Sequence, residues 1–590
     1  MKNPHPFQSN LACLLVIITA GLLVYANHLL NPFQYDSVRF LSENHQFADP
    51  ARLISPEFVL KEYFHRGGLF WTYGLNAWLH GMDPFGFHLI NLMFHLMNGA
   101  LIFLVTQRAL PYFNFTSQFL SHRGLSLAVA LLFVLHPIQT ETVVYVMSRS
   151  ELIAGWFYLL GFYFFQRETG EAGSEWTLKN TVRTTLVTLL FIILGYSIKP
   201  TIITLPATML AYFLLGRKKE DPLWDRIRKY KIVIIAGFLV SAMALTAKLA
   251  IDPFFLAGTS GAVETIGRQT YLLTQPWVIM FYYLKLLLFP FGLNIDPEIV
   301  PATTLISWRF LAGFSAITIS LWVAFKKPST RLPLFGLIWF FIVLSPSSSF
   351  VTLLDLAAEH RVYLAAYGVF VIITLGLARL INITVSDSPR RRGWFFVTLL
   401  LLLLTYGTLT IKRNQVWSSE VTLWEDVLEK SPNKVRALVN LGHAYTNRGN
   451  RDKAIDFYQR SLKKGAHYFQ TYYNVAVLYL EKGETEKAFE HFQIAARIDG
   501  SIPDVHARLG DLYMQREDWK NADAYLRKAV ELNPGYASAF RSLGILHYYY
   551  MKEPRAGVAF LKRSLHLNPD QPDADKVRAL IAQYEAKSRK

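Results

Sequence analysis

The feature that most constrains this chain is a succession of apolar runs, each close to 20 residues long. A bilayer core of roughly 30 Å is crossed by about 20 helical residues, and runs of this order recur from Leu11 to Ile411. We predict spans at residues 11–30, 86–106, 124–137, 151–166, 181–197, 200–215, 232–250, 307–325, 333–348, 361–381 and 394–411. Residues 1–411 are therefore expected to form a polytopic all-α bundle of about eleven spans. The first run lacks a clear small-residue cleavage site, so we interpret it as an anchor and not as a signal peptide.

Positive charge sets the predicted orientation, because Lys and Arg collect in cytoplasmic loops. Dense basic stretches lie at 217–231, 326–331 and 390–392. An even number of spans must separate them if all three are cytoplasmic. A twelfth apolar run, 272–290, contains Lys285 and two prolines, and we predict that it is a re-entrant or interfacial helix on the outer side. The N-terminus is then inside, and the loop 31–84 and everything after Ile411 are outside.

The C-terminal part of the chain is polar and repetitive. Residues are 52% hydrophobic overall, yet the mean hydropathy is only +0.24, so a polar region must balance the apolar one. From Lys412 onward a period of 34 residues appears. Small residues hold this spacing at Gly442, Ala476, Gly510 and Gly544, and at Ala454, Ala488, Ala522 and Ala556. Large residues hold it at Tyr458, Phe492, Leu526 and Phe560, and Tyr445, Tyr479, Tyr513 and His547 form a fourth column.

This is the tetratricopeptide (TPR) pattern, in which each repeat is a helix pair and the pairs stack into a solenoid. We predict about four repeats in 433–590, preceded by a junction at 412–432. Within the junction, Glu420 to Lys430 is expected to be a half repeat, since Trp424 lies one period before Tyr458. Such arrays bind a peptide or partner protein in a groove; a purely structural spacer is the alternative.

The basic net charge of +17 would permit nucleic-acid binding, but cytoplasmic loops of a membrane protein explain the excess more directly. The single cysteine, Cys13, excludes an intrachain disulfide and is expected to be a small apolar residue of the first span. Glycine patterns that bind nucleotide phosphates are absent from the sequence.

Five segments give the chain a family resemblance: PFQYDSVRFLSEN (32–44), FHLINLMFHLMNG (87–99), HPIQTETVVYVMSRSELIAG (136–155), KPTIITLP (199–206) and AEHRVYLAAYG (358–368). Together with the repeats, they resemble the transmembrane and tetratricopeptide-repeat (TMTC) proteins. That family is related to the protein O-mannosyltransferases, which share the membrane-embedded C-type (GT-C) glycosyltransferase fold. This chain looks like a bacterial relative, which implies a multi-pass inner-membrane protein with its first loop and repeats in the periplasm.

The resemblance implies a polyprenyl-phosphate sugar donor and an acidic base shortly after the first span, which matches Asp36. A hydroxyl is a weak nucleophile, so a carboxylate within hydrogen-bond reach must take its proton as it attacks the sugar. A single displacement would invert the anomeric carbon. The family often carries a second acidic residue beside the first, and here Ser37 stands there, so no metal site is predicted. The alternative for Asp36 is a helix cap or a solvated surface residue.

The leaving phosphate needs cations, and four lie at predicted outer ends of spans: Arg66, Arg149, Lys199 and Arg361. Each alone could be a residue that extends to the membrane interface, but the four together predict a phosphate site, with Arg361 as its main ligand. Supporting roles are expected for Glu141, Glu359 and Tyr363, with Glu141, Arg149 and Glu151 forming ion pairs; a catalytic role for Glu141 is the alternative. His136 is predicted to hydrogen-bond at a helix end, whereas His88 and His95 are predicted to be packing residues because no acidic partner completes a zinc pattern.

The sequence thus favours a glycosyltransferase that acts on a hydroxyl of a protein presented by the repeats. The alternatives are a non-catalytic membrane scaffold that docks periplasmic proteins, and a transferase that acts on a glycan or lipid. The sugar, the acceptor, metal dependence and oligomeric state are not encoded in these motifs.

Overall fold

The computed structural model describes residues 6–42, 54–57, 66–169, 178–216, 235, 239, 266–326, 331–349 and 352–588. Within these ranges every regular element is a helix and no strand occurs, which confirms the predicted all-α fold. The chain forms two compact units, Met1–Pro432 and Asn433–Lys590.

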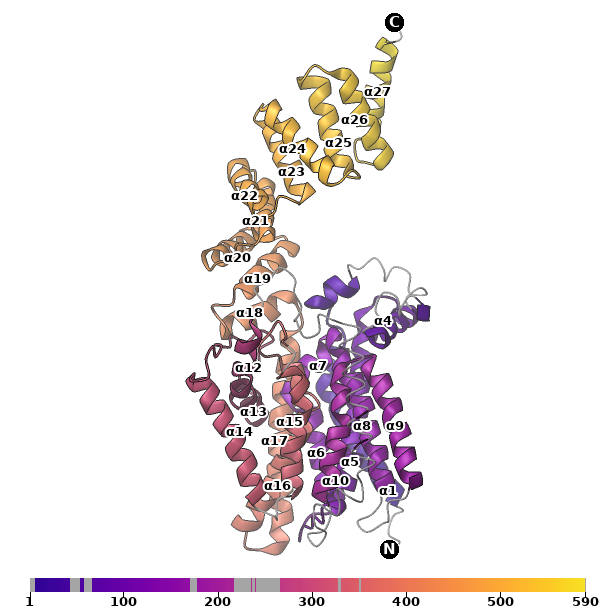
Figure 1. The fold of residues 1–590 in the computed structure, drawn as a ribbon, viewed down its shortest axis with the longest axis vertical. Coiled ribbons are helices and arrows are strands. Elements are labelled where there is room, and N and C mark those ends of the chain that lie inside the picture. The colour runs from indigo at the N-terminus through magenta and orange to yellow at the C-terminus, as the bar shows by residue number, and fades with distance from the viewer. Residues whose placement is uncertain are drawn as a thin grey trace. The chain divides into compact units, whose positions relative to one another are not determined.

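The first unit is a bundle of long apolar helices (Figure 1). Its helices are α1 (Pro6–Tyr25), α4 (Gly67–His80), α5 (Pro84–Tyr112), α6 (His122–Leu135), α7 (Thr140–Val144), α8 (Arg149–Thr169), α9 (Leu178–Tyr196), α10 (Leu205–Gly216), α12 (Arg268–Trp277), α13 (Leu284–Leu288), α14 (Trp308–Lys326), α15 (Arg331–Leu344), α16 (Ala366–Thr384), α17 (Ser388–Val416) and α18 (Glu420–Lys430). Helix α5 packs against α6 and α8, α8 against α9, and α15 against α16. The start of α5 is fixed by Asp83, whose side chain accepts a hydrogen bond from the backbone N–H of Phe85 at 3.1 Å.

Six helices of the described chain are long and apolar enough to cross a membrane: Asn10–His28, Pro84–Tyr112, Arg268–Leu288, Trp308–Lys326, Ala366–Thr384 and Arg390–Val416. A bent pair, His122–Leu135 with Pro137–Val144, adds a seventh candidate, and three shorter apolar helices lie at Val182–Tyr196, Pro200–Gly216 and Arg331–Ser347. The predicted span 232–250 falls outside the described residues apart from Ile235 and Leu239. The total of about eleven spans stays a prediction, as does the interfacial placement of 272–290, because Arg268–Leu288 has the length and hydropathy of a span.

Three predicted span ends differ from the structure. The helix of the predicted span 124–137 ends at Leu135, and the following segment Pro137–Val144 is bent from it by 50°, because Pro137 has no N–H and forces His136 into an extended conformation. The side chain of His136 accepts a hydrogen bond from the backbone N–H of Ile138 at 3.2 Å, as expected for a helix-end residue. The predicted span 361–381 begins only at Ala366, and the last span continues past Ile411 to Val416. Each difference moves polar residues to the end of the bundle.

The long helices have two distinct polar ends. At one end, Asn10 at the start of α1 bonds Gln107 at 3.2 Å and Arg123 at 3.1 Å. At the other end, Asn27 donates to the carbonyl of Ile411 at 3.0 Å, and Asn414 donates to that of Val24 at 3.0 Å. Helices α1 and α17 therefore run parallel, and the segment after α1 lies at the same end as α18. We call this end the α18 end.

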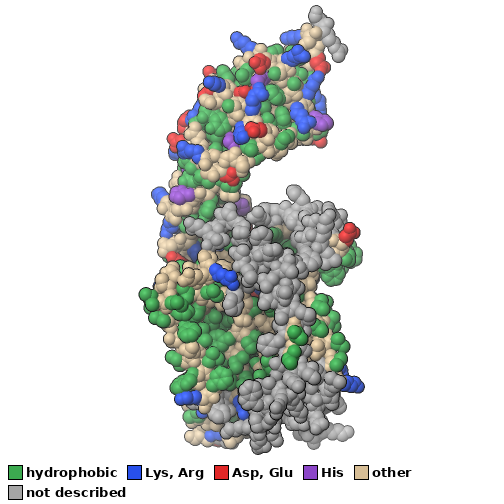
Figure 2. Space-filling view, in the orientation of Figure 1, with side chains coloured by type: hydrophobic (Ala, Val, Ile, Leu, Met, Phe, Trp, Pro, Cys, Tyr) green, Lys and Arg blue, Asp and Glu red, His purple; other side chains and the backbone are tan. Residues whose placement is uncertain are grey.

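Much of the bundle surface is apolar. In the 18-residue window of α14 that best fits a span, only 6% of the residues are buried. On the face drawn in Figure 2, hydrophobic side chains cover much of the described surface of the first unit, whereas charged side chains are spread over the repeats. This distribution fits a lipid environment for the first unit and water for the second.

The second unit consists of helix pairs. They are α19 (Val435–Asn447) with α20 (Arg451–Lys463), α21 (Phe469–Glu481) with α22 (Thr485–Ile498), α23 (Pro503–Gln515) with α24 (Trp519–Leu532), α25 (Ala537–Ile545) with α26 (Pro554–Leu567), and a final helix α27 (Ala574–Ser588). The paired helices cross at the predicted small residues. A Cβ atom on Gly442 would lie 2.7 Å from the ring of Tyr458, and one on Gly510 would lie 2.6 Å from Leu526. The glycines therefore permit the close approach that the repeat pattern predicts.

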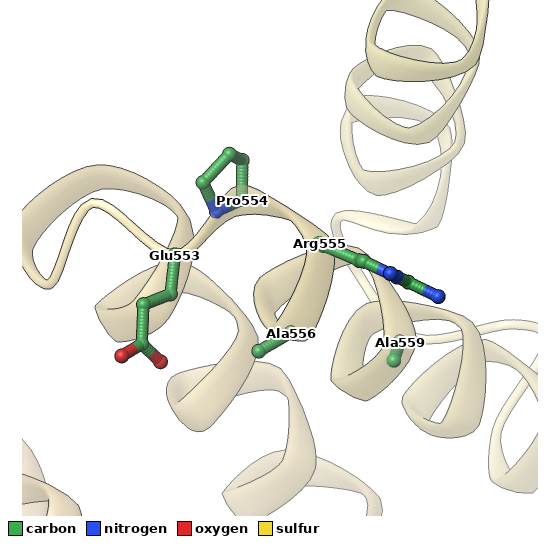
Figure 3. A pocket seen from close by; sticks show the side chains of 5 residues that line it. All are labelled: Glu553, Pro554, Arg555, Ala556 and Ala559. Carbon is green, nitrogen blue, oxygen red and sulfur yellow. The ribbon is translucent and has the colours of Figure 1, made fainter. Parts of the chain in front are cut away.

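The fourth repeat departs from the period in its second helix. A π-helical turn, Leu546–Tyr550, follows α25 and inserts one extra residue. Gly544 consequently packs against Leu561, with a Cβ-to-Cγ distance of 2.6 Å, and not against Phe560. Gly557 is buried in the place predicted for Ala556, while Ala556 itself lines a shallow surface depression with Glu553, Pro554, Arg555 and Ala559 (Figure 3). The predicted columns are correct for the first three repeats and shifted by one residue in this helix.

Candidate functional site

Asp36 lies in the segment that follows α1, and its neighbours are aromatic. The Tyr145 hydroxyl donates a hydrogen bond to Asp36 Oδ2 at 3.1 Å, while the Asp36 side chain is exposed. Burial, followed by the negative charge of Asp36, raises the pKa of Tyr145 well above its ordinary value, so the phenol stays a donor. The ring of Tyr145 lies between Tyr35 at 5.6 Å and Trp417 at 5.7 Å. The carboxylate is thus held by a buried, neutral donor and faces outward.

The backbone beside Asp36 is strained. Tyr35 has a φ of 57°, in the left-handed region that bulky residues rarely adopt. Its ring contacts Tyr145 and also Trp424 of α18, with centroids 5.5 Å apart. Such strain persists only where surrounding contacts impose it, and it gathers at functional sites. These aromatic contacts therefore fix the direction of the Asp36 side chain.

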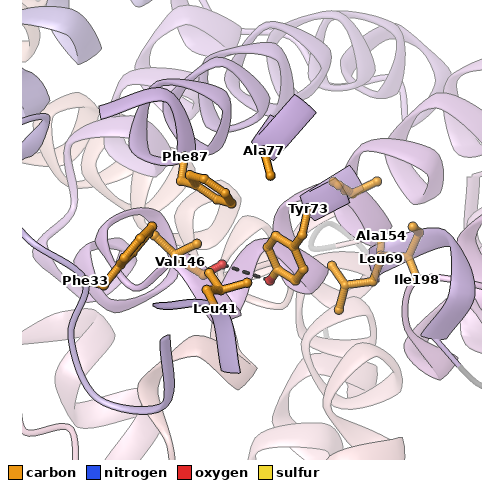
Figure 4. Packing of buried hydrophobic residues seen from close by; sticks show 10 residues of the cluster. Phe33, Leu41, Leu69, Tyr73, Ala77, Phe87, Val146, Ala154 and Ile198 are labelled. Atoms are coloured by element: carbon orange, nitrogen blue, oxygen red, sulfur yellow. Dashed lines mark hydrogen bonds between the residues drawn. The ribbon is translucent and has the colours of Figure 1, made fainter. Parts of the chain in front are cut away.

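A hydrophobic cluster anchors the same segment (Figure 4). Phe33 and Leu41, on either side of Asp36, pack with Tyr73 of α4, Phe87 of α5 and Val146. The Tyr73 hydroxyl donates to the Val146 carbonyl at 3.0 Å, the dashed line in Figure 4. The neighbouring position predicted to differ from the family, Ser37, is 0% exposed and cannot share the outward-facing role of Asp36.

Arg149 differs from its predicted role as a phosphate ligand. The side chain is 0% exposed. Its guanidinium donates to Asn91 Oδ1 and Asn76 Oδ1, both at 2.8 Å, and to the carbonyls of Phe87 at 3.1 Å and Thr72 at 3.3 Å. It also lies over the Tyr73 ring, 4.7 Å from the centroid. Because these contacts occupy the guanidinium inside the protein, Arg149 joins α4, α5 and α8 and positions the site without facing it.

The other three predicted cations lie near one another. Lys199 Nζ pairs with Glu151 Oε1. Burial lowers the pKa of Lys199, Glu151 opposes that effect, and the positive charges of Arg66 and Arg361 lower it further. Arg361 Nη1 donates to the Asp355 carbonyl at 2.9 Å and to the Tyr271 hydroxyl at 3.4 Å. Arg66 is exposed and Arg361 is half-buried. We call Arg66, Lys199 and Arg361 the cation cluster.

Glu141 lies beside this cluster and pairs with His360, which no sequence motif singles out. Its Oε1 is 2.5 Å from His360 Nδ1, and its Oε2 accepts the backbone N–H of Glu359 at 3.1 Å. Burial, together with the charge of Lys199, lowers the pKa of His360 to about 3, so the ring is neutral. The expected ion pairs among Glu141, Arg149 and Glu151 are therefore incorrect: Glu141 pairs with His360 and Glu151 with Lys199.

Glu359 links the cation cluster to the last long helix. The Glu359 carboxylate accepts the backbone N–H of Asn294 through Oε1, and its Oε2 is 3.9 Å from Arg413 Nη2. Arg413 in turn pairs with Asp426 of α18 at 2.6 Å. Arg413 was missed because the predicted span ended at Ile411, and Asp426 because the half repeat was interpreted only as a joint. The helical extension to Val416 places both in the network.

The remaining predicted residues are structural. The Tyr363 hydroxyl accepts a hydrogen bond from Asn98 at 3.0 Å and lies 3.0 Å from His95 Nδ1. His95 also contacts the Val134 carbonyl, and His88 contacts that of Asn31 at 3.0 Å. These buried contacts confirm both histidines as packing residues. Among the described residues, no group of three His, Cys, Asp or Glu side chains is placed to hold a metal ion.

Comparisons with known proteins identify the repeats and the relatives of the whole chain. Tetratricopeptide-repeat models match residues 437–466, 469–501 and 503–536. The chain is 26% identical over 501 residues to protein O-mannosyl-transferase TMTC3 of Mus musculus, covering 75% of this chain and 50% of that protein. It is 24% identical over 430 residues to human TMTC1, covering 66% and 47%, and 23% identical over 476 residues to F38B6.6 of Caenorhabditis elegans, covering 78% and 63%.

The homologues of this chain are therefore TMTC protein O-mannosyl-transferases, and the chain spans about half the length of the curated relatives it matches. Among solved structures, the crystal structure of MamA is similar at 22% identity, covering 26% of this chain and 88% of that one with a TM-score of 0.24. The crystal structure of YrrB, a TPR protein, is similar at 17% identity, covering 34% and 97% with a TM-score of 0.26.

Proposed function

We propose that this chain, a homologue of the TMTC proteins, is a membrane glycosyltransferase that moves a sugar from a polyprenyl phosphate to a hydroxyl of a protein. The observation that carries the proposal is the position of Asp36: an exposed carboxylate, held by Tyr145, at the end of an apolar bundle where three cations also gather. A general base and an anion site at a membrane boundary are the two elements that this reaction requires.

In the proposed reaction Asp36 takes the proton of the acceptor hydroxyl as the oxygen attacks the anomeric carbon of the sugar. The bond from that carbon to the phosphate oxygen breaks, and the negative charge passes to the lipid phosphate. A single displacement of this kind inverts the anomeric carbon. The Tyr145 hydroxyl keeps the carboxylate oriented while it accepts the proton.

The cation cluster is the proposed site of the phosphate. Arg361 has one Nη atom held by Asp355 and Tyr271, which fixes the guanidinium plane, and its side chain is only half-buried. Lys199 is held by Glu151, and the exposed Arg66 adds a third positive charge. Cations fixed in place before the reaction stabilise the leaving phosphate without reorganisation. Glu141, Glu359 and His360 would keep Arg361 and the turn around it in position.

The repeats are proposed to hold the protein acceptor, with the first loop and the repeats on the periplasmic side of a bacterial inner membrane. Homology to TMTC protein O-mannosyl-transferases, together with three matched TPR segments, supports a protein acceptor over a glycan or lipid. The same homology makes mannose the first sugar to test.

The test replaces Asp36 by Asn in the full chain, reconstituted in lipid nanodiscs with polyprenyl-phosphate mannose and a Ser/Thr-rich peptide. Removing the base should lower kcat by about 10² to 10⁴-fold. Glu57→Gln, which removes an exposed carboxylate from the same loop, is the matched control and should keep wild-type activity. Full activity of Asp36→Asn would exclude Asp36 as the base. A wild-type chain that is inactive with every polyprenyl donor would favour the membrane scaffold.

A further inference from the structure

Helix α18 belongs structurally to the membrane unit, although its sequence continues the repeat pattern. It spans Glu420–Lys430 and begins with a capping box, in which Ser419 and Thr422 bond each other's backbone N–H. Its buried face consists of Val421, Leu423, Trp424 and Val427. The following Ser431 is fixed to the bundle as well, because its hydroxyl bonds Asn294 Nδ2 at 2.9 Å and the N–H of Glu298 at 3.1 Å.

One contact from α18 reaches Tyr35, the residue that precedes the proposed base. Trp424 is 2% exposed and meets the Tyr35 ring edge-on, with centroids 5.5 Å apart. Tyr35 immediately precedes Asp36 and has the strained φ of 57°. A strained conformation requires contacts that hold it, and Trp424 supplies one of them from outside the first loop. Removing the indole would free Tyr35 to relax, and Asp36 would turn with it.

A second contact from α18 reaches the cation cluster by a different route. Asp426 pairs with Arg413 at 2.6 Å, and the Arg413 guanidinium faces the buried Glu359 carboxylate at 3.9 Å. Lys430 holds Asp426 in turn at 2.5 Å and donates to the Leu293 carbonyl at 2.8 Å. Because Glu359 adjoins His360 and Arg361 in the chain, the position of Asp426 bears on the turn that presents the cations. An uncompensated buried Arg413 would disturb this turn.

We infer that α18 is a positioning element of the site: Trp424 orients the Asp36 segment, and Asp426 orients the Glu359–Arg361 turn. The inference rests on the proposed function for its effect on catalysis, but the contacts it names also have a readout independent of activity. Since α18 is continuous in sequence with the first full repeat, the base and the cations are both held by the segment that leads into the acceptor-binding array.

The experiment compares four variants of the full chain in nanodiscs: Trp424→Ala, the conservative Trp424→Phe, Asp426→Asn, and Glu429→Gln as a control that removes an exposed carboxylate of the same helix. Hydrogen–deuterium exchange is measured for the segment 34–42 and for the turn 358–363, with α5 as the internal standard for intact folding. Sugar transfer to the Ser/Thr-rich peptide is measured as kcat and KM.

Trp424→Ala should speed exchange in 34–42 and lower kcat by about tenfold to a hundredfold, as expected for a displaced catalytic group, with little change in KM for the peptide. Trp424→Phe should keep both the exchange rate in 34–42 and kcat close to the wild-type values. Asp426→Asn should speed exchange in 358–363 and lower kcat, whereas Glu429→Gln should match the wild type.

Unchanged exchange in both segments, with α5 intact, would overturn the inference whether or not the protein transfers sugar. In an active wild type, unchanged kcat in Trp424→Ala and Asp426→Asn would also overturn it. If the wild type is inactive, the proposed function fails, yet faster exchange confined to these two segments would still support α18 as the element that holds them.

Discussion

At the scale of single residues, Glu359 connects the cation cluster to stability. It is 1% exposed, and burial raises the pKa of Glu359 to about 7 from an ordinary value of 4.5. The positive charge of Arg413 opposes this effect, and the nearby carboxyl of Glu141 adds to it. The folded protein therefore favours a proton on this pair of buried carboxyl groups.

The stability of the first unit should therefore depend on pH through Glu359. Between pH values of about 4.5 and 7, the folded protein holds a proton that the unfolded chain has lost. A rise in pH through this window thus lowers the free energy of unfolding, by on the order of 2 kcal/mol. The Glu359→Gln variant lacks the group, so its melting temperature should fall less than that of the wild type between pH 5 and pH 8.

Thermal melting of the detergent-solubilised chain measures this difference, with the exposed Glu57→Gln as the control that should keep the wild-type slope. Equal pH slopes for wild type and Glu359→Gln would contradict the assignment of a raised pKa to Glu359.

Residue roles were predictable from sequence where chain position alone fixes the environment. His136 before Pro137 was identified as a helix-end residue, and Lys199 and Arg361 were placed at one end of the bundle. The role of Arg149 could not be predicted in this way. A cation at the start of a helix has the same sequence context whether it faces a ligand or donates to Asn76 and Asn91. Those partners lie 58 and more positions away, and only the packing of α4, α5 and α8 reveals them.

At the scale of elements, the fourth repeat offers a sharp test of its shifted register. A Cβ on Gly557 would lie 2.7 Å from the Tyr548 nitrogen and 2.8 Å from the Gly544 carbonyl oxygen, both backbone atoms that cannot turn aside. We therefore expect Gly557→Ala to destabilise the second unit by about 1–3 kcal/mol. Ala556→Ser, at the surface depression, should be nearly neutral. If the fourth repeat kept the strict 34-residue period, Ala556 would lie at the helix crossing. Ala556→Ser would then have the lower melting temperature of the two variants.

The sequence predicts the positions of the helices well, but it does not predict where several of them end. Apolar length marks the centre of each span, but the bend at Pro137 follows from the missing N–H of that residue, and the extension of α17 to Val416 depends on polar contacts with a distant segment. The π-helical turn Leu546–Tyr550 also follows from packing, since the sequence there, LHYYY, continues the helical pattern without a break. The 34-residue period therefore predicts the helix pairs but does not predict the extra residue of the π-helical turn.

At the scale of the whole molecule, the proposed reaction depends on topology. The first loop and the repeats must face the same side of the membrane. The predicted orientation places them on the same side only if an even number of spans separates the basic loops. We expect a reporter enzyme fused after Lys590 to be active outside the cell and one inserted between Lys326 and Arg331 to be active in the cytoplasm. A cytoplasmic signal from the fusion after Lys590 would mean that Arg268–Leu288 spans, and the repeats could not meet an external acceptor.

The register shift of the last repeat has a consequence for anyone who wishes to lengthen or graft this solenoid. After α26, the next helix is α27, whose Val577 and Ile581 pack on Val558 and Leu561 of α26. A module spliced on by copying the spacing of the first three repeats would present its hydrophobic stripe rotated by one residue, about 100° around a helix axis. Added units must therefore be aligned to Leu561 and not to Phe560.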